Sequence, residues 1–206
     1  MVDASLKEYT RRKWDKAAAN FDFMVSKGPE RRWSPWKKEL FSQMEGDILF
    51  LALGTGLDIP AFPPGKKITA IDISSKMIDQ ARTRIEAYDG TIDAQVMDVH
   101  DLEFEDASFD QIYTSCTFCS VPEPIEGLKS LRRVIKPDGV LYMFEHTGSR
   151  YFPFSLMMDL MTPLSRKVGP EMNRKTEDNV NAAGFKVVEV NNIFLDVVKT
   201  IKAVPV

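Results

Sequence analysis

The sequence predicts an α/β fold built on one doubly wound, seven-stranded sheet that is mostly parallel and has an antiparallel C-terminal strand. Short apolar segments alternate with helical patterns through the middle of the chain, as in parallel sheets covered by helices. Only Asn191 and Asn192 are predicted to link the last two apolar runs, 185–190 and 194–204, which favours a hairpin over a crossover. The 206 residues suit one domain with a sizeable core.

Five apolar segments are predicted as the parallel strands: 47–53, 67–73, 92–97, 109–115 and 139–145. Two helices are predicted between them, at 74–87 and 124–135, because apolar residues recur there at helical spacing. The second helix should end before the breaker sequence at 136–139, Lys-Pro-Asp-Gly.

Residues 1–45 are predicted to form two amphipathic helices that belong to the same domain as 46–206. The first places basic residues beside an apolar stripe. Its cations are Arg11, Arg12, Lys13 and Lys16, and its stripe is Trp14, Ala17, Ala18, Phe21, Met24 and Val25. The second should begin near Ser34 and Pro35, a good N-cap followed by a proline, and should stack Trp36, Leu40, Phe41 and Met44.

The charge distribution is uneven although the net charge is only -3. Residues 1–41 hold ten Lys/Arg and six Asp/Glu, and the remainder holds seventeen and twenty-four, so a basic leader precedes an acidic body. This balance argues against a nucleic-acid partner. Two cysteines and an N-terminus without an apolar signal predict a cytosolic protein. The most apolar stretch, 151–164 within an insertion near 150–172, is broken by Pro153, Asp159 and Pro163 and is not predicted to cross a membrane.

A glycine turn, Gly54-Thr55-Gly56, follows the first strand and would let a ligand approach the backbone closely. A dinucleotide fingerprint needs a further glycine where this chain has Ile59, and a phosphate-binding P-loop needs a lysine that is absent here. Asp72 ends the second strand eighteen residues after Gly54, near the spacing at which an acid reaches ribose hydroxyls, and Asp98 ends the third strand. These features predict a nucleoside-containing ligand at the carboxyl ends of the strands.

The motifs resemble those of class I S-adenosylmethionine-dependent methyltransferases. The resemblance rests on LALGTG, AIDIS followed by KMIDQA, VMDVHDLEFEDASFD and LRRVIKPDGVLYMFE. It implies a Rossmann-like fold with S-adenosyl-L-methionine as cofactor and S-adenosyl-L-homocysteine as product. It also implies that Gly54 and Gly56 pass under the methionine part, Asp72 holds the ribose, Ile73 and Val99 flank the adenine, and Asp98 accepts from its amino group. Thr55, Met77 and Ser115 are further cofactor-binding candidates.

Two positions depart from the family pattern. Phe50 stands where the family usually has an acid that helps to hold the cofactor's ammonium group, and Ala52 stands where it usually has a glycine. Asp58 is the candidate that replaces the missing acid. The same departures favour an alternative interpretation, a non-catalytic module that binds the cofactor or a membrane.

The acceptor is expected to be hydrophobic, because the basic, aromatic leader and the apolar insertion both suit an oily substrate or an anionic bilayer surface. CSVP after the fourth strand and FEHTGS after the fifth resemble bacterial phosphatidylethanolamine N-methyltransferases and related lipid-surface thiol methyltransferases. The resemblance implies a cytoplasmic enzyme, peripheral on the inner face of the membrane, in phosphatidylcholine biosynthesis. A monomer is expected. A small hydrophobic, thiol or quinone acceptor remains the alternative.

His146 is the predicted general base, since an amine must lose its proton before it can attack. Glu145 beside it and Tyr9 in the leader are further catalytic candidates, and an ordinary packing role remains open for each. Cys116 and Cys119 form a C-x-x-C sequence, but too few other ligands exist for a zinc site, so no metal is expected. Lining of the pocket is favoured over redox chemistry for both cysteines.

Overall fold

A computed structural model describes residues 3–25 and 29–206, and the side chains of these residues except 24–31 and 166–168. Met24 and Val25, expected in the apolar stripe of the first helix, lie outside the described side chains. The strands are β1 (Ile48–Leu51), β2 (Lys67–Asp72), β3 (Thr91–Val96), β4 (Phe109–Ser115), β5 (Ile135–His146), β6 (Phe185–Phe194) and β7 (Val198–Pro205). The helices are α1 (Ala4–Val25), α2 (Pro29–Phe41), η1 (Ile59–Ala61), α3 (Ser75–Glu86), α4 (Pro124–Val134), α5 (Phe154–Val168) and α6 (Thr176–Ala182).

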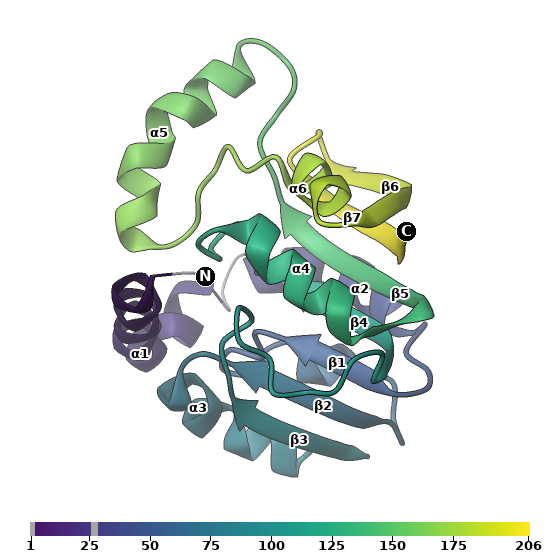
Figure 1. Ribbon diagram of the computed structural model, residues 1–206. Coiled ribbons are helices and arrows are strands. Elements are labelled where there is room, and N and C mark those ends of the chain that lie inside the picture. The colour runs from purple at the N-terminus through teal and green to yellow at the C-terminus, as the bar shows by residue number, and fades with distance from the viewer. Residues whose placement is uncertain (1–2, 26–28) are drawn as a thin grey trace.

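The seven strands form one sheet in the order β3-β2-β1-β4-β5-β7-β6. Neighbours from β3 to β5 pair in parallel, and β7 pairs antiparallel with both β5 and β6. The predicted doubly wound sheet with an antiparallel last strand is therefore confirmed, and Figure 1 shows helices packed on both of its faces.

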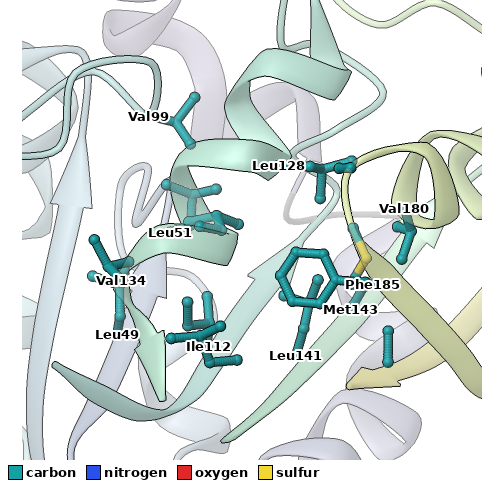
Figure 2. Close-up of a cluster of buried hydrophobic side chains, with 14 of the residues drawn as sticks. Leu49, Leu51, Val99, Ile112, Leu128, Val134, Leu141, Met143, Val180 and Phe185 are labelled. Carbon is teal, nitrogen blue, oxygen red and sulfur yellow. The ribbon is translucent and has the colours of Figure 1, made fainter. Parts of the chain in front are cut away.

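Two apolar clusters fill the space on the two faces of the sheet. Figure 2 shows the cluster in which Leu49, Ile112 and Leu141 of the sheet meet Leu128 of α4 and Val180 of α6. The other cluster joins the sheet to Leu40 and Phe41 of α2 and to Ala81 of α3. α2, α3, α4 and α6 thus bury apolar side chains against the sheet, as the spacing of the apolar residues predicts for α3 and α4.

Two predicted strand boundaries were wrong. β5 begins at Ile135, directly after α4, and its pairing with β4 shifts register between Phe109 and Gln111, so the predicted breaker sequence lies inside a strand. Asn191 and Asn192 are part of β6, and the turn lies at 195–197, where Leu195 has φ +49°. β6 is an edge strand that pairs only with β7, so exposed polar side chains are compatible with its strand conformation.

The predicted start of α2 was also wrong. The helix begins at Pro29, and Pro35 lies inside it rather than at its first turn. A proline there removes one backbone hydrogen bond. The burial of Leu40 and Phe41 further along the helix offsets that loss, whereas Trp36 is 40% exposed and does not stack with them as expected.

The insertion between β5 and α6 forms α5, which projects from the sheet at the upper left of Figure 1. Its apolar side chains are largely uncovered: Phe152, just before the helix, is 81% exposed, and Leu160 and Leu164 are 74% and 70% exposed. Within residues 3–25 and 29–206, no helix combines the length and the apolar character needed to cross a bilayer.

Candidate active site

A cavity of about 600 Å³ lies at the carboxyl ends of the central strands. The ends of β1, β2, β4 and β5 form its floor, and residues of α1 and α2 form part of its walls. Most of the lining surface is apolar. Of the predicted cofactor residues, Gly54, Thr55, Asp58, Asp72, Ile73, Met77, Asp98, Val99 and Ser115 all line this one cavity.

The two glycines of the turn have different structural roles. Gly54 has φ +58°, and a Cβ built on it would meet nothing within 4 Å, so this backbone faces open space in the cavity. Gly56 has φ +79°, and a Cβ on it would lie 2.8 Å from Ile59 Cδ1 and 3.2 Å from Ala81 Cβ. Gly54 therefore leaves room for a ligand, and Gly56 permits close packing against α3.

Asp72 is held at the floor of the cavity by two backbone amides. The Gly54 N–H donates to Oδ2 and the Ser74 N–H donates to Oδ1, each at 2.8 Å. Only 6% of the residue is exposed, and this burial raises the pKa of Asp72 to about 6 against the two amide hydrogen bonds that oppose it. Ser74 caps α3 by accepting from the Met77 N–H, so the helix start fixes the position of the carboxylate.

Asp98 forms a hydrogen-bonded pair with His100. His100 Nδ1 lies 2.7 Å from Asp98 Oδ1, and its Nε2 lies 2.7 Å from the Pro122 carbonyl oxygen, so both ring nitrogens face acceptors. Burial opposes the charged ring, but the two acceptors outweigh it and raise the pKa of His100. Burial likewise opposes the Asp98 carboxylate, and the hydrogen bonds from His100 hold the pKa of Asp98 below its ordinary value. His100 thus orients the predicted adenine-binding acid.

Two acids of α1 that sequence reasoning missed hold this helix against the glycine loop and the start of α3. Asp15 accepts a hydrogen bond from Ser74 Oγ at 2.6 Å. Asp22 accepts from Thr55 Oγ1 and forms an ion pair with Arg84 of α3 at 2.6 Å. The sequence does indicate that the two acids act together. They stand seven residues apart on a basic, amphipathic helix, and this spacing places both on one face.

The opposite end of the cavity holds the predicted base. His146, at the end of β5, lines the cavity, and its Nδ1 is buried without a hydrogen-bond partner among the described residues. Burial lowers its pKa, which favours the neutral ring that a base requires. Ser115 Oγ, also at the cavity, is likewise buried without a described partner.

The other two predicted catalytic residues lie outside the described lining. Glu145 is fully buried, and its Oε1 accepts from Thr114 Oγ1 and from the backbone N–H groups of Thr117 and Phe118. Burial raises the pKa of Glu145 to about 7. The carboxyl group therefore fixes the conformation of the loop after β4 by accepting hydrogen bonds from its backbone. Tyr9 is 60% exposed on α1 and is not brought to the cavity.

Cys116 and Cys119 both line the cavity, in the loop after β4. Cys119 Sγ donates to the Cys116 carbonyl oxygen at 3.2 Å. Burial raises the pKa of Cys119 to about 12; Cys116 is exposed to the cavity, and its enclosed position there raises its pKa well above the ordinary value. Neutral thiols of this kind are poor nucleophiles and poor redox groups, so their contribution at neutral pH is to the shape of the pocket.

A buried ion pair in the wall joins α2 to the glycine loop and includes another residue that sequence reasoning missed. Lys37 Nζ lies 2.8 Å from Asp58 Oδ1. The sequence does contain an indication that Lys37 is buried. Lys37 stands at helical spacing from Trp33, Leu40 and Phe41, and this spacing places it on the buried side of α2.

Residues 49–143 match the model of the methyltransferase domain family. The chain carries an S-adenosylmethionine-dependent methyltransferase domain. It is 34% identical to a ubiquinone/menaquinone biosynthesis C-methyltransferase of Geotalea daltonii, over 68% of this chain and 64% of that protein. It is 28% identical to a human thiol S-methyltransferase, over 78% and 71%, and 29% identical to a phosphatidylethanolamine N-methyltransferase of Cereibacter sphaeroides, over 82% and 80%.

The fold is that of solved enzymes of this class. An S-adenosylmethionine-dependent methyltransferase from Thermotoga maritima superposes with a TM-score of 0.67 at 17% identity, covering 95% of this chain and 99% of that one. The superposition confirms the predicted Rossmann-like fold, and the family match and the sequence relatives confirm the predicted enzyme class and cofactor. The buried carboxylate of Asp72 and the open space at Gly54 fit a nucleoside cofactor.

Proposed function

We propose that this enzyme transfers a methyl group from S-adenosylmethionine to a hydrophobic acceptor that it takes from a membrane surface. The observation that carries the proposal is the apolar wall that the cavity presents beyond the cofactor residues. Trp33, Phe144 and Phe194 pack together there, with ring centroids 6.5 and 6.0 Å from that of Trp33. A large aromatic wall is suited to an acceptor with an apolar body.

The surface of α5 supports docking on a bilayer. Phe152, Leu160 and Leu164 expose apolar side chains that a bilayer interface would cover. α1 adds cations: Arg11, Arg12 and Lys16 are exposed, although Glu8 pairs with the first two. Figure 1 shows α1 and α5 on the same side of the molecule. We therefore propose a monomer of one domain, peripheral at the cytoplasmic face of the membrane, with residues 1–45 as its lid.

The amine of phosphatidylethanolamine, or of its methylated derivatives, is the first candidate acceptor. When bound, S-adenosylmethionine supplies an electrophilic methyl group. The pocket must then align a neutral nitrogen with that methyl group and exclude water. His146 is the proposed base: its neutral ring would take the proton that the ammonium loses, so that the nitrogen lone pair is free to attack.

A thiol or a reduced quinone is the second candidate, and the charge of the pocket favours it. Asp58 lines the cavity too, but its carboxylate is already paired with Lys37. Apart from Asp58, Asp72 and Asp98, no carboxylate among the described lining residues is present to attract a protonated amine. A neutral thiol or quinol needs no such attraction, and His146 could take its proton in the same way.

The test is incubation with methyl-labelled cofactor and one acceptor class at a time: phosphatidylethanolamine vesicles, a reduced quinone in neutral vesicles, or a small alkyl thiol. Labelled phospholipid supports the first candidate, and label only in thiol or quinol supports the second. Label in none of the three contradicts the proposal.

Vesicle sedimentation of Leu160→Asp with Leu164→Asp tests docking, and Val188→Asp, an exposed apolar position on β6, is the matched control.

A further inference from the structure

The ion pair between Lys37 and Asp58 is buried where most of the surroundings are apolar. The two side chains are only 6% and 13% exposed. Lys37 comes from α2, and its Nζ also lies 5.5 Å from the centre of the Phe144 ring. Asp58 comes from the loop that continues the glycine turn. Removing two charges from water is costly, so a pair retained in a ligand cavity calls for a role there.

The pair lies at one end of the row of cofactor residues. Asp98 follows β3, Asp72 ends β2, and Gly54 and Asp58 follow β1, and these three strands are adjacent in the sheet. A cofactor with its adenine at Asp98 and its ribose at Asp72 therefore extends its amino acid portion over Gly54 toward Asp58.

Among the described residues, Asp58 is the carboxylate placed to meet that portion. Phe50, at the position where an acid is usual, is fully buried, and its ring centre lies 4.9 Å from that of Phe62. Of the carboxylates that line the cavity in the described part of the chain, Asp72 accepts from two backbone amides and Asp98 is paired with His100.

We infer that Lys37 and Asp58 together bind the zwitterionic end of the cofactor, with Asp58 accepting from its ammonium group and Lys37 donating to its carboxylate. A lysine ammonium group has three N–H donors and can hold more than one acceptor. The four charges alternate in sign, so no net charge is added to a low-dielectric cavity. The inference rests on the cofactor and not on the proposed acceptor.

Titration calorimetry with two ligands tests it. S-Adenosylhomocysteine carries the zwitterion, and 5′-methylthioadenosine has the same nucleoside and sulfur without it. Lys37→Met should weaken S-adenosylhomocysteine about 10- to 100-fold, the range for a hydrogen bond between charged groups, and should change methylthioadenosine by less than about twofold. Lys38→Met, at the exposed neighbouring position, should change neither.

A second variant keeps the test valid if Lys37→Met destabilises the protein by leaving Asp58 unpaired. Lys37→Met combined with Asp58→Leu removes both charges, and it should lose affinity for S-adenosylhomocysteine while retaining methylthioadenosine. Equal losses for both ligands would reduce the pair to a structural role and overturn the inference. Unchanged S-adenosylhomocysteine affinity with a raised KM for the acceptor would overturn it too, because Lys37 would then serve the acceptor.

Discussion

If Asp72 holds the ribose hydroxyls, as the family resemblance implies, cofactor binding should weaken in acid, because the ionised carboxylate is a much stronger acceptor than the protonated carboxyl group. Burial raises the pKa of Asp72 to about 6, so the carboxylate is protonated below that pH and ionised above it. At about pH 5 roughly one molecule in eleven carries the ionised form, and at about pH 8 nearly all do. The dissociation constant of S-adenosylhomocysteine should therefore rise about tenfold between these pH values.

Titration calorimetry of the whole chain measures this effect directly. Near pH 6, where half of the carboxyl groups are protonated, binding should also release about half a proton, visible as a dependence of the measured heat on the ionisation enthalpy of the buffer. Asp72→Asn should weaken binding about 10- to 100-fold at pH 8 and remove most of the slope. Asp93→Asn, an exposed acid on β3, is the matched control and should retain the slope.

Two results would refute this reasoning. An affinity that stays constant from pH 8 to pH 5 would show that the ionised form of Asp72 is not required. The same slope in Asp72→Asn would assign the titration to another group, of which His100 is the nearest candidate, since the pKa of His100 is raised by its pairing with Asp98.

Three further outcomes are expected. Glu145→Gln should flatten the pH dependence of thermal stability. Between about pH 4.5 and pH 7 the native state keeps a proton on Glu145 that the unfolded chain loses, so the free energy of unfolding of the wild type falls by up to about 3 kcal/mol as the pH rises through that window. An equal slope in both proteins would contradict this. Asp22→Asn should speed dissociation of S-adenosylhomocysteine in stopped-flow measurements, whereas Asp79→Asn, in an exposed pair on α3, should not. His146→Gln should lower kcat about 10²- to 10⁴-fold with unchanged cofactor affinity; unchanged kcat would exclude it as the base.

The meeting of Asp72 and Asp98 in one cavity was predictable because its signals are local. Each acid follows the strand that positions it, and the carboxyl ends of parallel strands meet at one edge, so Asp72 and Asp98 could be placed from the order of the strands alone. The hairpin turn was misplaced because a polar Asn191-Asn192 pair is compatible with an exposed edge strand as well as with a turn.

The parts of the site that sequence reasoning missed depend on contacts between distant segments. Asp22 meets Arg84 across 62 residues of sequence, and Lys37 meets Asp58 across 21. Helical spacing shows which face a charged residue occupies, but only the packing of α1 and α2 on the sheet shows what that face meets. Tyr9 illustrates the converse, because an aromatic side chain on a helix that covers the cavity points into solvent.

Phe50 connects the core of the enzyme to its inferred cofactor specificity. An acid at this position would have to leave the aromatic cluster, where the Phe50 ring packs against Phe41 and Phe62 at centroid distances of 5.6 and 4.9 Å, and reach the cavity. A buried phenylalanine stabilises the fold by roughly 1.5 to 3 kcal/mol, but it cannot accept a hydrogen bond from the cofactor's ammonium group. If Asp58 supplies the negative charge instead, it does so from a loop that faces the cavity. Because the wall beside this carboxylate is apolar, its charge must be balanced by a nearby cation. Lys37 is that cation, so phenylalanine at position 50 is compatible with the inferred binding of the cofactor by the pair at positions 37 and 58.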